Sequence, residues 1–394
     1  MRYILIKNGS IVTPNSDISQ KDILIGNQRI LQIEKSIAPP HYQTQIIDAQ
    51  DSYILPGLIN YLCPFIKKED EKSLCAMYKS IAHGATMLID TIRKKNSTLD
   101  TADINRLVEE FKFLTPSYGF HLSASAIQHL KFKDIQELFI FQGCSSIVIK
   151  WKHVEKIIDK KLQIVFDAAA QNGLPIIITT KRVKDSLLIS KAPFFQSYLS
   201  KLRVIKDLAR HANITMIFTD IVSHEEVEAI SPSKYNNHIY LSLTYGNNKI
   251  PAPLSKTDVL NMAKYDFALL QPPSVSEEKS LTSIYQDNSN NNSFLFQLLE
   301  EELNFNHRIK EVTMMYATRP AKILGIYPEK GVLTAGADAD IILWQPNQKQ
   351  STTHSILRKD IKGMLINGQL ITHSELILPV GSGQFKYRNG AMSF

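Results

Sequence analysis

The chain has 394 residues, of which 44% are hydrophobic and 21% are charged. This length and balance suit a globular protein with one large domain and a small companion, and they exclude a disordered chain. The formal net charge is +7 at pH 7. Because its lysines and arginines are scattered in short pairs such as Lys67-Lys68 and Lys160-Lys161, we expect no nucleic-acid partner.

The cysteines and the N-terminus bear on where the protein works. Cys63, Cys75 and Cys144 form no Cys-x-x-Cys pair, and so low and odd a count predicts a reducing compartment without a disulfide framework. The apolar stretch that follows Met1 is too short for a signal peptide. No run reaches the ~18 uninterrupted apolar residues that a membrane span needs. We therefore expect a cytoplasmic protein that has no membrane partner.

The first 56 residues indicate short strands separated by turns. An apolar run at 3–7 ends at Asn8-Gly9, a pair that favours a tight turn. Further runs rich in β-branched residues are bounded by similar turn signals. They lie at 22–25, 29–33, 45–48 and 53–56.

From residue 57 to about 327 short apolar runs alternate with longer amphipathic stretches. The predicted strands lie at 86–90, 120–124, 146–149, 175–179 and 215–219. The predicted helices lie at 73–83, 98–114, 155–172 and 201–212. This alternation over about 270 residues predicts a parallel (β/α)8 barrel.

After residue 327 the strand pattern returns, with runs at 340–344 and 357–366, then the turn Asn367-Gly368 and a last run at 369–372. Neither end of the chain has enough strands to bury a sheet face alone. We therefore predict a composite β-sandwich domain from 1–56 and 328–394, and a barrel domain from 57–327.

Several segments carry a family resemblance. They are LIKNGSIV at 5–12, LPGLIN at 55–60, GATMLID at 84–90, ATRPAKILG at 317–325, AGADADIILW at 335–344 and VGSGQF at 380–385. Together they resemble the cyclic amidohydrolases: dihydropyrimidinase, hydantoinase, dihydroorotase and allantoinase. The resemblance covers essentially the whole chain. It implies an α/β fold, a TIM-like (β/α)8 barrel of the metal-dependent hydrolase type with a small β-sandwich domain formed by both chain ends.

The resemblance also implies a metal site, which the residues present do not supply. The family activates a water with divalent metals, usually zinc, held by histidines, a carbamoylated lysine and an aspartate at the C-terminal ends of barrel strands. In this sequence those positions hold Leu62, Pro64, Val148, Thr179, Thr219 and Leu270. Because zinc needs Cys, His or carboxylate ligands, we predict no metal, no cofactor and none of the family's catalytic residues.

Four polar residues remain as candidates for an improvised site near the barrel mouth: Asp90, His121, Lys150 and Asp220. One interpretation is a new acid/base or metal cluster. The other is that such residues satisfy backbone groups and helix ends, which is their commoner use. Cys63, between two of the lost positions, should face away from the barrel interior because strand side chains alternate.

The leading hypothesis is a catalytically silent dihydropyrimidinase/dihydroorotase-like pseudoenzyme that serves as an oligomeric scaffold or partner subunit. By resemblance, we expect a homo-oligomer, a dimer or a tetramer, and a partner enzyme of pyrimidine metabolism. One alternative is a divergent hydrolase that acts on cyclic amide C–N bonds, and another is a small-molecule sensor for a pyrimidine-like ring. An open cavity would favour the sensor, whereas a mouth plugged by Tyr61, Phe65 and Leu270 would favour the scaffold.

Overall fold

The computed structural model describes most of the chain. The described residues are 2–14, 17–66, 71–94, 99–140, 142–180, 192–231, 238–244, 253–270, 294–299, 305–346, 357–373, 381 and 383–388. Residues 271–293, which follow Leu270, lie outside them. No helix in these ranges is both long enough and apolar enough to cross a membrane.

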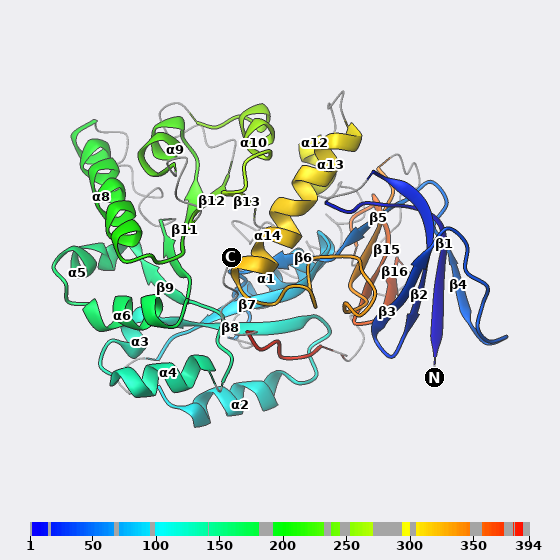
Figure 1. Ribbon diagram of the computed structural model, residues 1–394, viewed down its shortest axis with the longest axis horizontal. Helices are drawn as coiled ribbons and strands as arrows, with labels where there is room; N and C mark the ends of the chain where they lie inside the picture. Colours follow the sequence, from blue (N-terminus) through cyan, green and yellow to red (C-terminus); the bar gives the residue numbers. More distant parts are fainter. Residues whose placement is uncertain are drawn as a thin grey trace.

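Eight parallel strands form one curled sheet in which each strand pairs with the next along the chain (Figure 1). They are β6 (Leu58–Asn60), β7 (Ala85–Ile92), β8 (Ser117–Ser123), β9 (Ile147–Lys150), β10 (Ile176–Thr179), β11 (Met216–Ile221), β12 (Ile239–Leu243) and β13 (Ala268–Leu269). This consecutive parallel order confirms the predicted TIM-like fold. The five strands proposed from the sequence correspond to β7 through β11.

The first and last strands are bridged by a helical segment. The hydrogen-bonded order runs from β13 to β6, and no ladder joins these two among the described residues. The π-helical segment η3 (Met314–Thr318) packs against both strands. Leu270 donates its backbone N–H to the Met315 carbonyl at 3.1 Å. The seam of the barrel is therefore filled by helix backbone.

Helices follow the strands, and most of them cover the outside of the sheet (Figure 1). They are α1 (Glu71–Ala82), α2 (Thr101–Phe111), α3 (Ala124–Ile127), α4 (Phe132–Ile140), η1 (Trp151–His153), α5 (Val154–Ile158), α6 (Gln163–Gln171), α8 (Ala192–His211), α9 (His224–Ile230), α10 (Lys256–Met262), α12 (Phe294–Leu299), α13 (Phe305–Thr313) and α14 (Arg319–Ile323). The helix predicted at 155–172 is split into α5 and α6. Lys160 lies between them at φ 60°, a left-handed conformation that cannot continue a helix.

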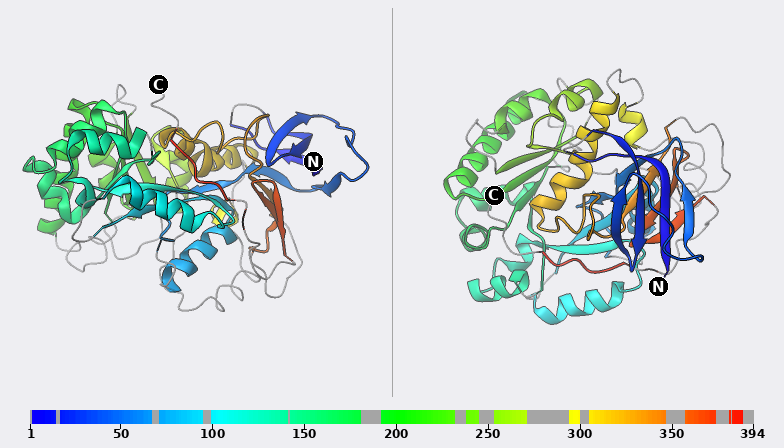
Figure 2. Two further views of the ribbon diagram at one scale, coloured as in Figure 1. Left: turned by 90° about the horizontal axis from the view of Figure 1, so that it is seen from below. Right: turned by 45° about the vertical axis from the view of Figure 1, so that its right-hand side comes forward.

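Both chain ends build the small domain, as predicted (Figure 2). Its strands are β1 (Tyr3–Ile11), β2 (Ser19–Gly26), β3 (Arg29–Glu34), β4 (Gln45–Asp48), β5 (Tyr53–Pro56), β14 (Ile341–Trp344), β15 (Ile361–Ile366) and β16 (Gln369–Thr372). The two ends join where β5 pairs antiparallel with β14, Leu55 opposite Ile342. All eight strands belong to one sheet, and the exact domain boundaries stay predictions.

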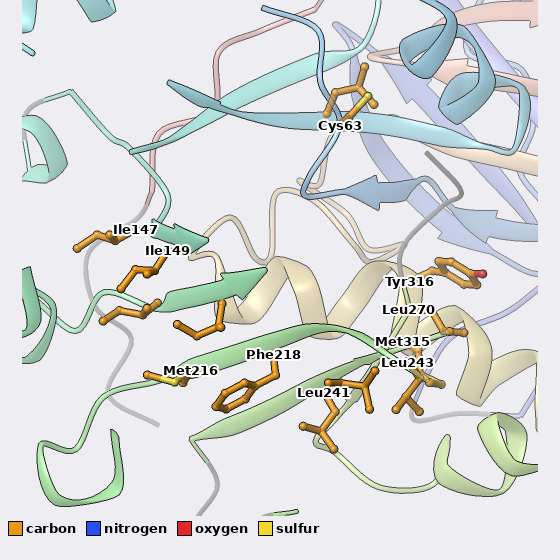
Figure 3. Close-up of a cluster of buried hydrophobic side chains, with 14 of the residues drawn as sticks. Cys63, Ile147, Ile149, Met216, Phe218, Leu241, Leu243, Leu270, Met315 and Tyr316 are labelled. Atoms are coloured by element: carbon orange, nitrogen blue, oxygen red, sulfur yellow. The ribbon is translucent and has the colours of Figure 1, made fainter. Parts of the chain in front are cut away.

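Alternate residues of the barrel strands enter two different cores. On β9, Ile147 and Ile149 pack toward the outer helices, as do Met216 and Phe218 on β11 (Figure 3). The residues between them enter a second cluster, here called the lumen cluster, to which six of the eight strands contribute. Its strand members are Ile59, Met87, Ile89, Val148, Ile177, Ile217 and Leu269. This alternation shows which side chains face the barrel interior.

Candidate functional site

The barrel interior is filled by apolar side chains. Val148, Ile177 and Ile217 pair in register across β9, β10 and β11 and form one layer. Ala321 and Ile323 of α14 enter the same cluster. Tyr61, which follows β6, also belongs to it and is fully buried. Apart from the Tyr61 hydroxyl, this layer of the barrel interior is therefore apolar.

Above that layer, toward the C-terminal ends of the strands, lies a polar row. Lys150 pairs with Thr179, and Thr179 pairs with Thr219. Each is two residues beyond a lumen-facing residue, so the alternation of the strand directs it to the same side. Lys150 and Thr179 are partly exposed, whereas Thr219 is buried. The row therefore places one ammonium group and two hydroxyls at the barrel mouth.

The six positions at which we predict that family residues are replaced do not all lie in one place. Val148, Thr179 and Thr219 face the interior, and Leu62 packs against the lumen cluster from the loop after β6. Pro64 lies farther along that loop and is partly exposed. Leu270 instead packs on the helix side, in the same core as Met315 and Tyr316 (Figure 3).

His121, on β8, is a fully buried and neutral histidine. Its Nε2 lies 2.6 Å from the Tyr61 carbonyl oxygen, and its Nδ1 lies 2.7 Å from the Ser146 hydroxyl. Since a carbonyl can only accept, Nε2 carries the proton and Nδ1 accepts from Ser146. Burial lowers the pKa of His121 to about 4. Both ring nitrogens are thus engaged by the protein itself.

Asp90, on β7, accepts hydrogen bonds from three backbone amides. Its Oδ2 accepts from the N–H groups of Phe65 and Ile66, each at 2.8 Å, and its Oδ1 accepts from Thr91 at 2.6 Å. Burial raises the pKa of Asp90, although these three hydrogen bonds oppose the shift. Asp90 and His121 therefore both hold the loop 61–66, which contains Leu62 and Pro64.

Asp220 lies at the mouth, near the end of β11. It has φ 59°, a conformation uncommon for a residue with a side chain, at a shift in the β11–β12 register. The Thr219 hydroxyl donates to its Oδ2 at 2.7 Å. Burial raises the pKa of Tyr61, the Ser242 hydroxyl opposes the shift, and the Asp220 carboxylate adds to it. The Tyr61 hydroxyl nevertheless has no hydrogen-bond partner of normal geometry.

The candidates do not assemble into a metal site. Among the described residues, no group of three or more His, Cys, Asp and Glu side chains could hold a metal ion. Cys63 lies in the helix-side core, as expected, with its Sγ 3.6 Å from the Ser80 hydroxyl. Burial raises the pKa of the Cys63 thiol to about 12, which leaves it protonated and inert.

Of the three side chains suggested as a plug, only Tyr61 lies in the lumen cluster. Phe65 packs edge-on against Phe111 at a centroid distance of 5.2 Å, because Asp90 binds its amide and turns the loop outward. Leu270 lies beside η3. The suggestion is therefore wrong for Phe65 and Leu270, since strand alternation alone could not show how the chain turns after β6 and β13.

The sequence analysis did not predict a second polar group near the mouth, formed by Tyr198 and Glu226. The Tyr198 hydroxyl on α8 donates to Glu226 Oε1 at 2.6 Å, and Glu226 is fully buried. The other carboxylate oxygen accepts from the N–H groups of Val222 and Ser223 at 2.9 and 3.0 Å. The Ser-x-x-Glu capping box at the start of α9 was the available signal. This group ties α8 to α9.

Comparison with known proteins shows that the chain is similar to amidohydrolases. The amidohydrolase family profile matches residues 275–371. D-hydantoinase from Rhizobium radiobacter is 22% identical, with 98% of each chain covered. Dihydropyrimidinase 2 from Caenorhabditis elegans is 24% identical and covers 99% of this chain and 87% of its own. The alignment with the Rhizobium protein spans 476 positions, more than this chain contains, so that relative has segments which this chain lacks.

Solved structures agree on the fold. Dihydropyrimidinase from Brevibacillus agri superposes with a TM-score of 0.73 at 17% identity, over 98% of this chain and 99% of that one. D-hydantoinase from Bacillus sp. AR9 gives a TM-score of 0.74 at the same identity and coverage.

Proposed function

We propose that the chain, which is similar to the cyclic amidohydrolases over nearly its whole length, is a metal-free relative that lacks the family's hydrolysis and serves as an oligomeric scaffold or partner subunit. The observation that carries the proposal is the chemistry of the barrel interior. Leu62, Val148, Thr179 and Thr219 stand on its lumen side. None of these side chains is a ligand that zinc prefers.

The remaining titratable groups also fit a metal poorly. Asp90 already accepts three backbone hydrogen bonds, and both nitrogens of His121 are engaged. Recruiting either residue as a ligand would leave buried backbone groups of the loop 61–66 without partners, at about 1–3 kcal/mol for each group. We assign no hydrolytic step to these residues.

The scaffold half of the proposal is supported by an exposed apolar stripe. Val204 and Leu208, one turn apart on α8, are 43% and 37% exposed. Residues four apart share one face of a helix. Apolar side chains that are exposed together on such a face can bury themselves against another protein chain. We expect the partner to be a second copy of the chain, with an enzyme of pyrimidine metabolism as the further partner.

The test joins metal content to turnover. After zinc loading and desalting, elemental analysis should find well under one metal per chain, and dihydrouracil, hydantoin and dihydroorotate should not be hydrolysed. Light scattering after size exclusion should show an oligomer that Val204→Glu weakens. Ile140→Glu on α4, where Ile140 is 61% exposed, is the comparison and should leave the oligomer unchanged.

Two partly exposed residues separate this proposal from a divergent hydrolase. If the chain hydrolyses one of these compounds, and Lys150→Met or Asp220→Asn abolishes that turnover without changing the unfolding transition, the proposal of catalytic silence is wrong. A monomer at micromolar concentration would overturn the scaffold half. Each half of the proposal can thus fail without the other.

A further inference from the structure

The small domain contains a cavity far from the barrel residues discussed above. Its volume is about 310 Å³, and it lies where the end of β1 and the start of β2 meet the segment that precedes β14. One part of its wall is polar, with Thr13, Ser19 and Lys21. The other part is apolar, with Ile11, Ile33 and Leu333. This volume is near the lower end for small-molecule sites, which are about 300–1,000 Å³.

Strand register explains why a lysine enters this cavity. Ser19 lies opposite Ile11 on β1, and Lys21 lies opposite Gly9. Since Ser19 and Lys21 are two residues apart on β2, they share one face of the sheet. That face is the inner one, because Ile23, the next residue of the series, is fully buried in the core of the small domain.

The opposite wall is held in place by backbone hydrogen bonds. The Ile30 N–H donates to the Ala337 carbonyl at 2.9 Å, and the Gly336 N–H donates to the Ile30 carbonyl at 2.8 Å. The Arg29 guanidinium also donates to the Gly336 carbonyl, at 2.6 Å. Figure 1 shows this orange segment against the blue strands. The cavity is therefore built jointly by both ends of the chain.

Lys21 carries a charge that the described part of the protein does not balance. It is partly buried, yet it makes no ion pair or side-chain hydrogen bond with a described residue, and neither does the Ser19 hydroxyl. Two other lysines of the same domain are paired: Lys7 lies 3.4 Å from Asp22, and the buried Lys330 lies 2.6 Å from Asp340. The Lys21 ammonium can therefore take an anion as a charge-assisted hydrogen-bond partner.

We propose that this cavity binds a small organic acid. The carboxylate lies at the Lys21 ammonium and accepts from the Ser19 hydroxyl, and a short apolar body lies against Ile11, Ile33 and Leu333. The charge-assisted contact supplies the orientation, and the apolar wall selects an acid over a bare inorganic anion. The site does not depend on the proposed function, because it shares no residue with the barrel mouth.

Calorimetric titration of the full chain with butyrate tests this site, with butyramide and inorganic phosphate as comparison probes. Butyrate should bind saturably, and butyramide, which has the same shape without the charge, should bind at least tenfold more weakly. Phosphate should also bind more weakly, since it leaves the apolar wall uncovered. Equal binding of butyrate and butyramide, or of butyrate and phosphate, would overturn the proposed ligand class.

Variants locate the binding. Lys21→Gln should weaken butyrate binding about tenfold or more, as expected for loss of a charged hydrogen-bond partner, and Ser19→Ala should weaken it severalfold. Lys35→Gln removes an exposed lysine of the same domain and should leave binding unchanged. Melting curves of the three variants show whether the domain is folded. No saturable binding to the wild-type chain, or equal effects of the Lys21 and Lys35 changes, would refute the site.

Discussion

At the scale of single residues, two polar side chains that were candidates for chemistry prove to hold the loop after β6. Asp90 binds the amides of Phe65 and Ile66, and His121 binds the carbonyl of Tyr61. The sequence could identify both residues as polar groups on predicted strands. It could not show their partners, because those contacts join residues 24 to 60 positions apart.

The burial of His121 predicts a pH-dependent stability. Its pKa is about 4 when folded, against 6.5 for an ordinary histidine, so between these values only the unfolded chain takes up the proton. The contribution of His121 to the free energy of unfolding is therefore complete above pH 6.5. It falls as the pH drops toward 4, by up to about 3 kcal/mol. Urea unfolding at several pH values should show this slope, and His121→Gln should reduce it.

His224→Gln is the matched control. His224 is exposed beside Asp258 on α10's N-terminal turn, and removing it should leave the slope between pH 6.5 and 4 nearly as in the wild type. Some slope should also persist in His121→Gln, because burial and Arg358 lower the pKa of His83. An identical slope in wild type and His121→Gln would contradict the assignment.

At the scale of elements, the C-terminal segment completes the edge of β8. β9 pairs with only the last two residues of β8, Leu122 and Ser123. Near the start of β8, the backbone N–H of Tyr118 donates to the Gln384 carbonyl, and the backbone carbonyl of Tyr118 accepts from the Lys386 N–H. The ring of Phe385 packs against Tyr118 and Phe120. The segment thus supplies the strand edge that β9 leaves uncovered.

Gly381 should be essential for this docking. A Cβ there would overlap the Leu114 carbonyl, so Gly381→Ala should push the segment away and cost about 2 kcal/mol or more. Gly336→Ala is the control, because a Cβ at Gly336 meets nothing within 4 Å and only its φ of 88° is unfavourable, at about 1 kcal/mol. Urea unfolding and limited proteolysis of the tail measure both. Equal effects of the two changes would contradict this view.

At the scale of the whole molecule, a buried ionic network joins the small domain to the barrel. The Lys330 ammonium lies 2.9 Å from Asp338 and 2.6 Å from Asp340. It also donates to the hydroxyl of Ser117, the first residue of β8, at 2.8 Å. Burial opposes ionisation of Asp338, but Lys330 and Lys386 outweigh it and hold the pKa of Asp338 below its usual value.

Removing the central cation should destabilise both domains together. Lys330→Met leaves two buried carboxylates with less compensation, a change that costs about 3–5 kcal/mol in comparable buried pairs. Lys112→Met, which breaks the exposed Lys112–Glu109 pair, should cost under about 1 kcal/mol. Urea unfolding followed by near- and far-ultraviolet circular dichroism measures both variants. A loss below 1 kcal/mol for Lys330→Met would show that the network does not couple the domains.

The sequence by itself determined the fold class and the composite small domain. These properties depend on local information: the period of apolar residues, turn pairs such as Asn8-Gly9, and residue identity within a recognisable frame. The same local information placed five barrel strands correctly. It misjudged one long helix, because the left-handed turn at Lys160 carries no glycine to signal it.

Only the tertiary structure decided which side chains fill the barrel and which side chains face the cavity of the small domain. That Tyr61 enters the interior while Phe65 leaves it follows from the hydrogen bonds of Asp90 and His121 to the loop between them. That Lys21 faces a cavity follows from the register of β1 and β2 and from a wall supplied by residues over 300 positions later. Such contacts join distant segments, and their geometry arises only when the sheets have paired and packed.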